Sequence, residues 1–379
     1  MTLWALADET RRLSVGDAIH LRGLVEISSR CTRQCAYCGL RVGNRSLTRY
    51  RMEPGEILES ARQAVKFGYG TVVLQAGEDF GLTCEWVADV VRQIKSETPL
   101  AVTLSLGERT EAELAAWRSA GADRYLLRFE TSDPDLFQLI HPSRNHATIE
   151  SSDLSNVPLP SPSPPQEERV GERRPLIARP LDATAAGSNQ RPADRIALLR
   201  HLQQLGYEVG SGIMVGLPGQ TYESVARDID LFRELDLDMI GIGPFIPHSQ
   251  TPLGNGELKP VAAPDHQVPN SELLVYKAVA LTRLVCPDAN IPSTTALATI
   301  NKRNGRELGL QRGANVLMPN LTPVKYRKLY EIYPAKACIE ETGSACNSCL
   351  KVRINAIGRL IARGPGGRRR RAPEVEVVC

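Results

Sequence analysis

Three cysteines, Cys31, Cys35 and Cys38, lie within eight residues and have the spacing C-x3-C-x2-C. Three thiolates cannot complete a tetrahedral structural zinc site, which needs a fourth cysteine or histidine. The nearest histidine in the sequence, His20, lies at the other end of the strand predicted before the cysteines. A cubane [4Fe-4S] cluster held by three cysteines instead keeps one iron open for a further ligand. The spacing therefore favours an iron-sulfur site over half a zinc ribbon or three buried cysteines.

A second group of cysteines, Cys338, Cys346 and Cys349, has the spacing C-x7-C-x2-C within a C-terminal segment at 334–350. We expect a second iron-sulfur site there, either [2Fe-2S] or [4Fe-4S], with zinc or three unused thiols as the alternatives. The other three of the nine cysteines have no partners by spacing, and nine is an odd number. Both facts argue against a closed disulfide framework.

The composition of the 379 residues is typical of a soluble globular protein, with 42% hydrophobic and 23% charged residues. A formal charge of +3 excludes a strongly polycationic nucleic-acid binder. No apolar run approaches the ~20 residues needed to cross a bilayer, and the N-terminus lacks the pattern of a secretory signal. We therefore expect a cytoplasmic protein with no nucleic-acid or membrane partner.

Short β-branched runs alternate with helical patterns, which indicates βα units around a parallel sheet. We predict strands at 22–28, 71–77, 101–107, 123–130, 207–216, 238–245, 290–296 and 314–319. Five helical patterns, beginning near residues 54, 84, 111, 222 and 271, lie between them. Eight strands predict an α/β fold, a complete (β/α)8 TIM-type barrel formed as a single domain by residues 1–379, with its active site at the carboxyl ends of the strands.

Two segments differ from this pattern. Residues 144–192 hold eight of the 26 prolines and have no apolar periodicity, so we predict a disordered Pro/Ser/Arg-rich insertion. Residues 363–379 begin with a basic run, RGPGGRRRR, and we expect a solvated basic tail there.

The first cysteine motif, with Tyr37 before its last cysteine, resembles the radical S-adenosylmethionine (SAM) superfamily. The resemblance implies that the open iron binds the amino and carboxylate groups of SAM. It also implies that the reduced cluster passes one electron into the sulfonium and so releases methionine and a 5'-deoxyadenosyl radical. A reductant protein is then a required partner.

Further motifs narrow the resemblance. RYRM at 49–52, VLQAGED, GADRYLLRFET, SGIMVGLPGQT, DMIGIGPFIPH and IPSTTA are together similar to the HydE family, the maturases of the [FeFe]-hydrogenase H-cluster. The family implies a complete barrel, a small-molecule or organometallic substrate, and the other hydrogenase maturases as partners. A mutase or synthase of the methylornithine synthase or biotin synthase type is one alternative. A non-catalytic zinc or Fe-S binding module is another.

Carried over residue by residue, the resemblance implies that Cys31, Cys35 and Cys38 hold the SAM cluster. The positions that it implies for SAM contacts are Tyr37, Thr103, Ser105, Arg128, Glu130, Arg195 and Met214. Those that it implies for the substrate chamber are Arg22, Gln75, Arg124, Thr294, Thr295, Met318, Tyr330 and Tyr333. Cationic and amide donors of this kind suit an anionic ligand. A surface ion pair is the alternative for Glu130 and Arg195.

Three further features need separate interpretation. GLPGQT at 216–221 lacks the lysine of a phosphate-binding loop, so we interpret it as a turn into the next helix. His248 ends the sixth predicted strand and is interpreted as a packed or capping histidine rather than a ligand or acid. The chain begins about twenty residues before the first predicted strand, so the leading helix of the family is expected to be truncated.

Overall fold

The computed structural model describes residues 1–142 and 192–368. The insertion predicted at 144–192 therefore lies outside the described residues, except for Pro192 at the start of a helix. The part of the basic tail after residue 368 lies outside them as well.

Parallel strands form one sheet in the order β6-β5-β4-β3-β2-β1-β7, and β8 pairs with the beginning of β1. The strands are β1 (Ala18–Ser28), β2 (Thr71–Ala76), β3 (Ala101–Ser105), β4 (Arg124–Leu126), β5 (Glu208–Val215), β6 (Met239–Pro244), β7 (Val316–Leu317) and β8 (Leu360–Ile361). The predicted α/β class and parallel sheet are confirmed.

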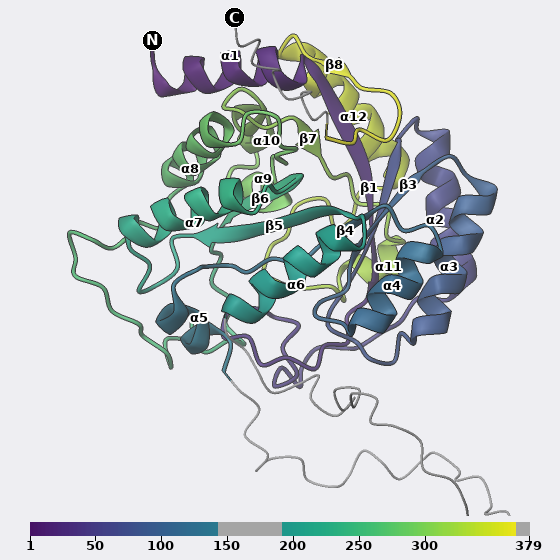
Figure 1. Cartoon of the computed structure of the whole chain (residues 1–379), viewed down its shortest axis with the longest axis horizontal. Helices are drawn as coiled ribbons and strands as arrows, with labels where there is room; N and C mark the ends of the chain where they lie inside the picture. The colour runs from purple at the N-terminus through teal and green to yellow at the C-terminus, as the bar shows by residue number, and fades with distance from the viewer. Residues whose placement is uncertain (143–191, 369–379) are drawn as a thin grey trace, which may run out of the picture.

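Helices cover the outer face of the sheet, with α2, α3 and α4 on one flank and α6, α7 and α8 on the other (Figure 1). They are α1 (Leu3–Val15), α2 (Pro54–Lys66), α3 (Cys84–Glu97), α4 (Glu111–Ser119), α5 (Pro134–Ile140), α6 (Pro192–Gln204), α7 (Tyr222–Glu234), α8 (Glu272–Val285), α9 (Thr295–Ile300), α10 (Gly305–Leu310), α11 (Val324–Arg327) and α12 (Gly343–Ala356). All five predicted helical patterns are confirmed. Thr83, Thr110 and Thr221 cap three of these helices, their side chains accepting a backbone N–H.

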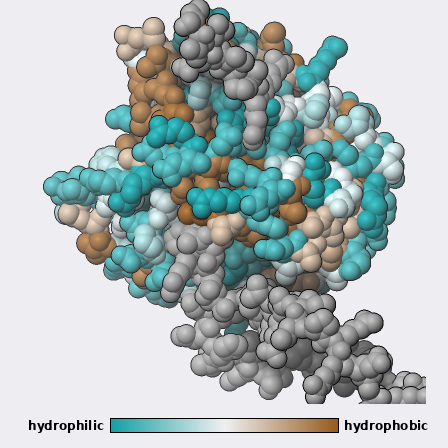
Figure 2. Space-filling model, in the orientation of Figure 1, coloured by the Kyte–Doolittle hydropathy of each residue, from teal (hydrophilic) through white to brown (hydrophobic). Residues whose placement is uncertain are grey.

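The surface of these helices is largely hydrophilic on the face in view, with separate hydrophobic areas between (Figure 2). Among the described helices none is long and apolar enough to pass through a bilayer. The helix α1, which the sequence patterns did not predict, packs against α8.

The predicted strand at 290–296 differs from the structure. This segment makes two isolated parallel bridges, Asn290 with Met239 of β6 and Pro292 with Val316 of β7. Proline has no N–H to donate to a ladder, which limits regular pairing on either side. The predicted strand at 314–319 is reduced to the two residues of β7, and β8 was not predicted.

Register places polar side chains at matching levels of neighbouring strands. Glu26 of β1 is opposite Gln75 of β2, and Gln75 is opposite Ser105 of β3. Two residues before Ser105 on β3, Thr103 is opposite Arg124 of β4. Residues two apart on a strand share a face, so Thr103 and Ser105 lie on the same face of β3.

The amino-terminal end of the sheet is covered by the C-terminal segment at 363–368. Arg22 donates to the Gly366 carbonyl (3.0 Å) and Arg124 donates to the Pro365 carbonyl (3.0 Å). Burial, followed by the charge of Arg124, lowers the pKa of Arg22 to about 9. Arg368 pairs with Asp288 at 2.9 Å. This part of the predicted solvated tail is therefore packed against the fold.

Replacement of Gly70 by alanine should destabilise this packing. A Cβ at Gly70 would lie 1.7 Å from the Gly364 carbonyl oxygen, so the C-terminal segment must shift. We expect the free energy of unfolding to fall by about 1–3 kcal/mol, as for other overpacked sites. Urea denaturation followed by circular dichroism measures it. Gly55→Ala, in the first turn of α2 with no neighbour within 4 Å of its Cβ, is the matched control and should be neutral or stabilising. Equal losses in the two variants would contradict the prediction.

Candidate active site

The three cysteines lie in the connection between β1 and α2, at the carboxyl end of the sheet. Backbone hydrogen bonds tie this cysteine loop, residues 29–53, to four other segments. They are Thr32 N to Glu78 O (3.0 Å), Ala36 N to Ile140 O (2.8 Å), Leu253 N to Ala36 O (3.0 Å) and Gly39 N to Ile332 O (3.0 Å). The last residue of α5 and the segments that follow β2, β6 and β7 thus position the loop.

Close backbone approach brings Cys31 against the segment after β2. A Cβ at Gly77 would lie 2.7 Å from the Cys31 Cβ and 2.3 Å from the Arg30 carbonyl oxygen, so only glycine fits there. The next residue, Glu78, donates its backbone N–H to Cys31 Sγ (3.4 Å). This N–H would remain available to a thiolate at Cys31, because a charged sulfur accepts hydrogen bonds more strongly.

The three thiols are partly buried, and burial raises the pKa of each of them, that of Cys35 to about 12. The charges of Arg33 and Arg195 partly oppose this rise at Cys35. In the described part of the chain, no three Cys, His, Asp or Glu side chains already stand in a metal-binding arrangement. Three cysteines in one anchored loop nevertheless supply the donor set that an [Fe-S] cluster needs, and cluster binding takes the thiolate form.

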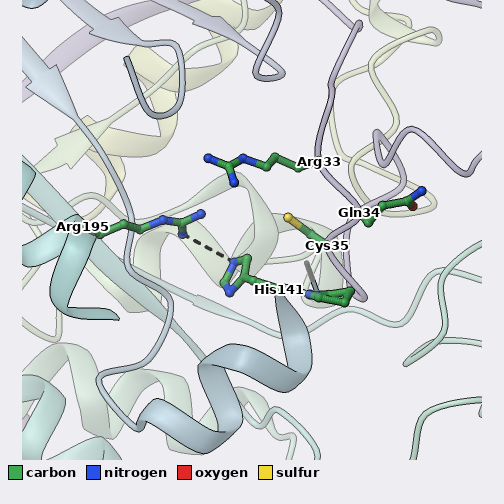
Figure 3. A pocket seen from close by; sticks show the side chains of 6 residues that line it. Arg33, Gln34, Cys35, His141 and Arg195 are labelled. Atoms are coloured by element: carbon green, nitrogen blue, oxygen red, sulfur yellow. Dashed lines mark hydrogen bonds between the residues drawn. The ribbon is translucent and has the colours of Figure 1, made fainter. Parts of the chain in front are cut away.

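Two arginines flank Cys35 and share one carboxylate. Arg33 pairs with Glu78 (2.6 Å) and with Glu108 (2.7 Å), and Arg195 pairs with the second oxygen of Glu108 (2.7 Å). Figure 3 shows the Cys35 sulfur pointing into the space between Arg33, Arg195 and His141, with Gln34 turned away. Arg195, which the resemblance placed among the SAM contacts, is buried and pairs with Glu108. The alternative of a surface ion pair does not describe it.

His141 orients Tyr37, the aromatic residue of the cysteine motif. Its Nδ1 lies 3.1 Å from the Phe137 carbonyl oxygen, which can only accept, so Nδ1 carries the proton. Its Nε2 therefore accepts from the Tyr37 hydroxyl (3.0 Å) and from Arg195 (3.4 Å). Burial, reinforced by the Arg195 charge, holds the pKa of His141 well below its usual range and keeps the imidazole neutral.

Sequence patterns did not single out Arg33, Glu108 or His141. The one available signal for His141 was its position four residues after Phe137, at the end of a short helical pattern. Arg33 lies inside the cysteine motif, and Glu108 follows directly after the third predicted strand.

Glu130 occupies a left-handed backbone conformation, with φ +67°. This conformation costs about 1–2 kcal/mol for a residue with a Cβ. Arg128 donates to both carboxylate oxygens of Glu130 (2.8 and 2.9 Å) and to the Ile213 carbonyl (2.6 Å). Glu130 is buried, so the pair lies inside the protein rather than on the surface. Backbone strain of this kind concentrates at functional sites.

The remaining residues predicted for SAM contacts lie on β3, on β5 and in the cysteine loop. Thr103 is buried, and its hydroxyl has no hydrogen-bond partner among the described residues. Ser105 lies level with Gln75. Met214 and Tyr37 pack against the same small hydrophobic cluster, which includes Ala36.

The predicted substrate residues divide into separate groups. Gln75 donates to the Tyr330 hydroxyl (3.2 Å), and beside them Lys336 forms a buried ion pair with Glu26. Burial and the Glu26 charge raise the pKa of Tyr333, which belongs to the same group.

Arg22 and Arg124 are not brought to this group. Arg124 contacts Thr71, four residues before Gln75 on β2, a separation of roughly 13 Å along a strand. Thr294 caps α9, Thr295 begins that helix, and Met318 follows β7.

The second cysteine group surrounds a cavity of about 540 Å³. Cys346 and Cys349 lie on α12 and Cys338 precedes it, with Cys338 in a left-handed conformation (φ +62°). Arg306 donates to Cys338 Sγ (3.4 Å). The hydrogen bond from Cys346, followed by the Arg306 charge, lowers the pKa of Cys338 to about 6. The three cysteines therefore line one cavity beside a cationic side chain.

Comparison with known proteins agrees with this geometry. Residues 25–152 match the Radical SAM superfamily. The chain is 42% identical over 368 residues to the [FeFe] hydrogenase maturase subunit HydE of Thermotoga maritima, covering 97% of this chain and 89% of that protein. The chain belongs to the HydE family.

Solved structures share the fold of this HydE-family chain. The crystal structure of methylornithine synthase (PylB) superposes with a TM-score of 0.71 at 22% identity, covering 95% of this chain and 88% of that one. HydG, a maturase of the [FeFe]-hydrogenase, superposes with a TM-score of 0.67 at 15% identity, covering 95% and 68%. A radical SAM enzyme of the HydE family thus has the parallel α/β architecture of these proteins.

Asp228 of α7 supports the strained segment at Glu130 and should make stability depend on pH. Its carboxylate accepts from the Ser132 N–H (2.6 Å), and burial raises its pKa from 3.8 to about 7, with Arg227 and Asp133 as its charged neighbours. Between these values the native carboxyl is protonated while the unfolded one is ionised. The free energy of unfolding should therefore fall as pH rises from 4 to 7, by up to about 1.4 kcal/mol per pH unit.

Asp228→Asn should flatten this pH dependence, since the amide keeps an oxygen acceptor for Ser132 and does not titrate. Urea denaturation of both proteins at pH 5 and pH 7 measures the difference. The same change in stability between the two pH values in both proteins would show that Asp228 does not cause it.

Proposed function

We propose that this protein is a HydE-type radical SAM enzyme that reductively cleaves SAM and acts in assembly of the [FeFe]-hydrogenase H-cluster. The observation that carries the proposal is 42% identity to the Thermotoga HydE over 97% of the chain, with the three-cysteine loop anchored at the carboxyl end of the sheet. The methylornithine synthase alternative has weaker support, with 25% identity to the Methanosarcina acetivorans enzyme over 83% of the chain.

Cys31, Cys35 and Cys38 would hold the [4Fe-4S] cluster. When bound, the cluster supplies the electron that cleaves SAM to methionine and a 5'-deoxyadenosyl radical. Arg33 and Arg195 place positive charge beside Cys35, where it stabilises thiolate. The Arg128–Glu130 pair presents a carboxylate that can accept from ribose hydroxyls or from the amino group of SAM.

We also propose that the sheet closes into a complete (β/α)8 barrel through the segment at 290–292. Its bridges to Met239 and to Val316 support this, because they link the two ends of the strand order, β6 and β7. A closed barrel would exclude water from a radical formed inside it.

The substrate is proposed to be a small organometallic anion bound near Gln75, Tyr330 and Tyr333. The Lys336–Glu26 ion pair next to Tyr330 adds a buried cation to that region. The proposed partners are a reductant protein and the other hydrogenase maturases. Arg22 and Arg124 would contribute to a more distant part of the chamber.

A second iron-sulfur site is proposed at Cys338, Cys346 and Cys349. Three thiols around one cavity support it, as does the Arg306 donor at Cys338. Cys349 is exposed, so this site would lie at the protein surface rather than in the pocket beside Cys35.

Replacing Cys31, Cys35 or Cys38 with alanine should abolish SAM cleavage, because each variant removes one thiolate of the cluster and with it the open iron. The measurement is 5'-deoxyadenosine released under dithionite after anaerobic reconstitution. Cys84→Ala, at the start of α3, is the control and should retain activity. Undiminished product from any of the three single variants would refute the site.

The triple variant Cys338→Ala, Cys346→Ala, Cys349→Ala should bind less iron and still release 5'-deoxyadenosine at a comparable rate. The reason is that one cluster in contact with SAM suffices for radical formation, and the first cysteine group supplies it. Iron analysis and product assay on the same sample decide the matter. A variant with a full first cluster but no SAM cleavage would instead show that the second site relays electrons.

A further inference from the structure

His248 lies against the cysteine loop at Gly39. It follows β6 and is 4% exposed. A Cβ at Gly39 would lie 2.7 Å from both Cδ2 and Nε2 of His248, so the imidazole edge rests directly on the residue after Cys38. This places a histidine ring beside the backbone of a proposed cluster ligand.

The hydrogen bonds of His248 assign its tautomer. The backbone N–H of Gln250 donates to Nδ1 (3.0 Å). Nδ1 is therefore the unprotonated nitrogen, and Nε2 carries the proton. The tautomer of His141 is the reverse, with Nε2 as the acceptor. Nε2 of His248 therefore presents a donor N–H to the cysteine loop, whereas Nε2 of His141 presents an acceptor.

Within the described residues, the Nε2–H of His248 has no acceptor although it is buried. Gly39 makes no hydrogen bond to it: the Gly39 carbonyl accepts from Asn44 Nδ2 (2.8 Å), and the Gly39 N–H donates to Ile332 O (3.0 Å). A buried donor without an acceptor destabilises the fold. Such a donor at a cofactor site indicates an acceptor that the chain itself does not supply.

The position of His248 is held tightly. Its carbonyl accepts from both the N–H (3.0 Å) and the hydroxyl (2.7 Å) of Thr251. Leu253, in the same turn, bonds to Ala36 of the cysteine loop. These hydrogen bonds fix the backbone at His248 relative to the loop that carries Cys35 and Cys38.

We propose that His248 donates its Nε2–H to a sulfur of the cluster bound by the cysteine loop, either the Cys38 thiolate or an adjacent sulfide, and so raises the cluster's reduction potential. This inference rests on the proposed function. Hydrogen bonds to cluster sulfurs stabilise the reduced, more negative state. His248 would then ease reduction of the cluster before SAM is cleaved.

The test compares His248→Phe, which removes the donor, with His248→Gln, which places an amide N–H close to the same position. Each protein is reconstituted, and the cluster is titrated without SAM while its reduced form is followed by electron paramagnetic resonance. At a fixed applied potential the ratio of reduced to oxidised cluster should fall about tenfold in His248→Phe, the loss of one hydrogen bond to a charged acceptor. His248→Gln should recover most of it.

His201→Phe is the matched control, because His201 also has an unpartnered Nε2 among the described residues but lies on α6 beside Glu111. Its potential should equal that of the unaltered protein. Should His248→Phe fail to bind iron, histidine labelled with ¹⁵N in the unaltered protein provides a second measurement. Electron-nuclear double resonance of the reduced cluster should detect a coupled ¹⁵N and an exchangeable proton that the His248→Gln variant changes.

The outcomes are distinguishable. An unaltered protein that binds no cluster contradicts the proposed function itself. A cluster with the same potential in all variants, or with no histidine ¹⁵N coupling, overturns the role of His248 while the proposed function stands. Unchanged potentials combined with weaker SAM binding in His248→Phe would place the donor on SAM and would also overturn the inference.

Discussion

The cysteine loop must satisfy its buried backbone groups without a helix or a strand of its own, and this constraint governs the site. Between the end of β1 and the start of α2 the chain runs for 25 residues, 29–53, in turns and irregular conformation. Buried N–H and C=O groups need partners. Several find them at the end of α5 and in the segments that follow β2, β6 and β7, so the loop geometry depends on elements far apart in the sequence. Three thiols at the proper spacing are therefore necessary but are not sufficient to build the site.

The charged groups around the loop must likewise find partners. Isolated buried charges are costly, whereas shared and hydrogen-bonded ones are tolerated. Glu108 serves both Arg33 and Arg195, and the neutral His141 accepts from Arg195 without adding a charge. Two carboxylates, Glu78 and Glu108, thus hold two guanidinium groups beside Cys35.

Much of the fold could be predicted from the sequence, because β-branched runs and 3.6-residue periodicity are local signals. Local signals failed at 290–296, where Pro292 interrupts the ladder, and at the C-terminal GPGG, whose composition is typical of a solvated tail although Arg22 and Arg124 bind its carbonyls. The cysteine motif was evident from spacing alone. The roles of Glu108 and His141 depend on contacts between segments far apart in the chain, which neither periodicity nor spacing encodes.

The pairing of β1 has a consequence for how the chain matures during synthesis. The first strand pairs with β2 along most of its length, but its other edge is completed by β7 and β8, which lie within the last 64 residues of the chain. While the ribosome is still making those residues, β1 has an open edge able to pair with other nascent chains. The cysteines of the loop leave the ribosome long before Ile332, which bonds Gly39. Insertion of an iron-sulfur cluster into a geometrically complete loop can therefore begin only after the chain has been made as far as Ile332.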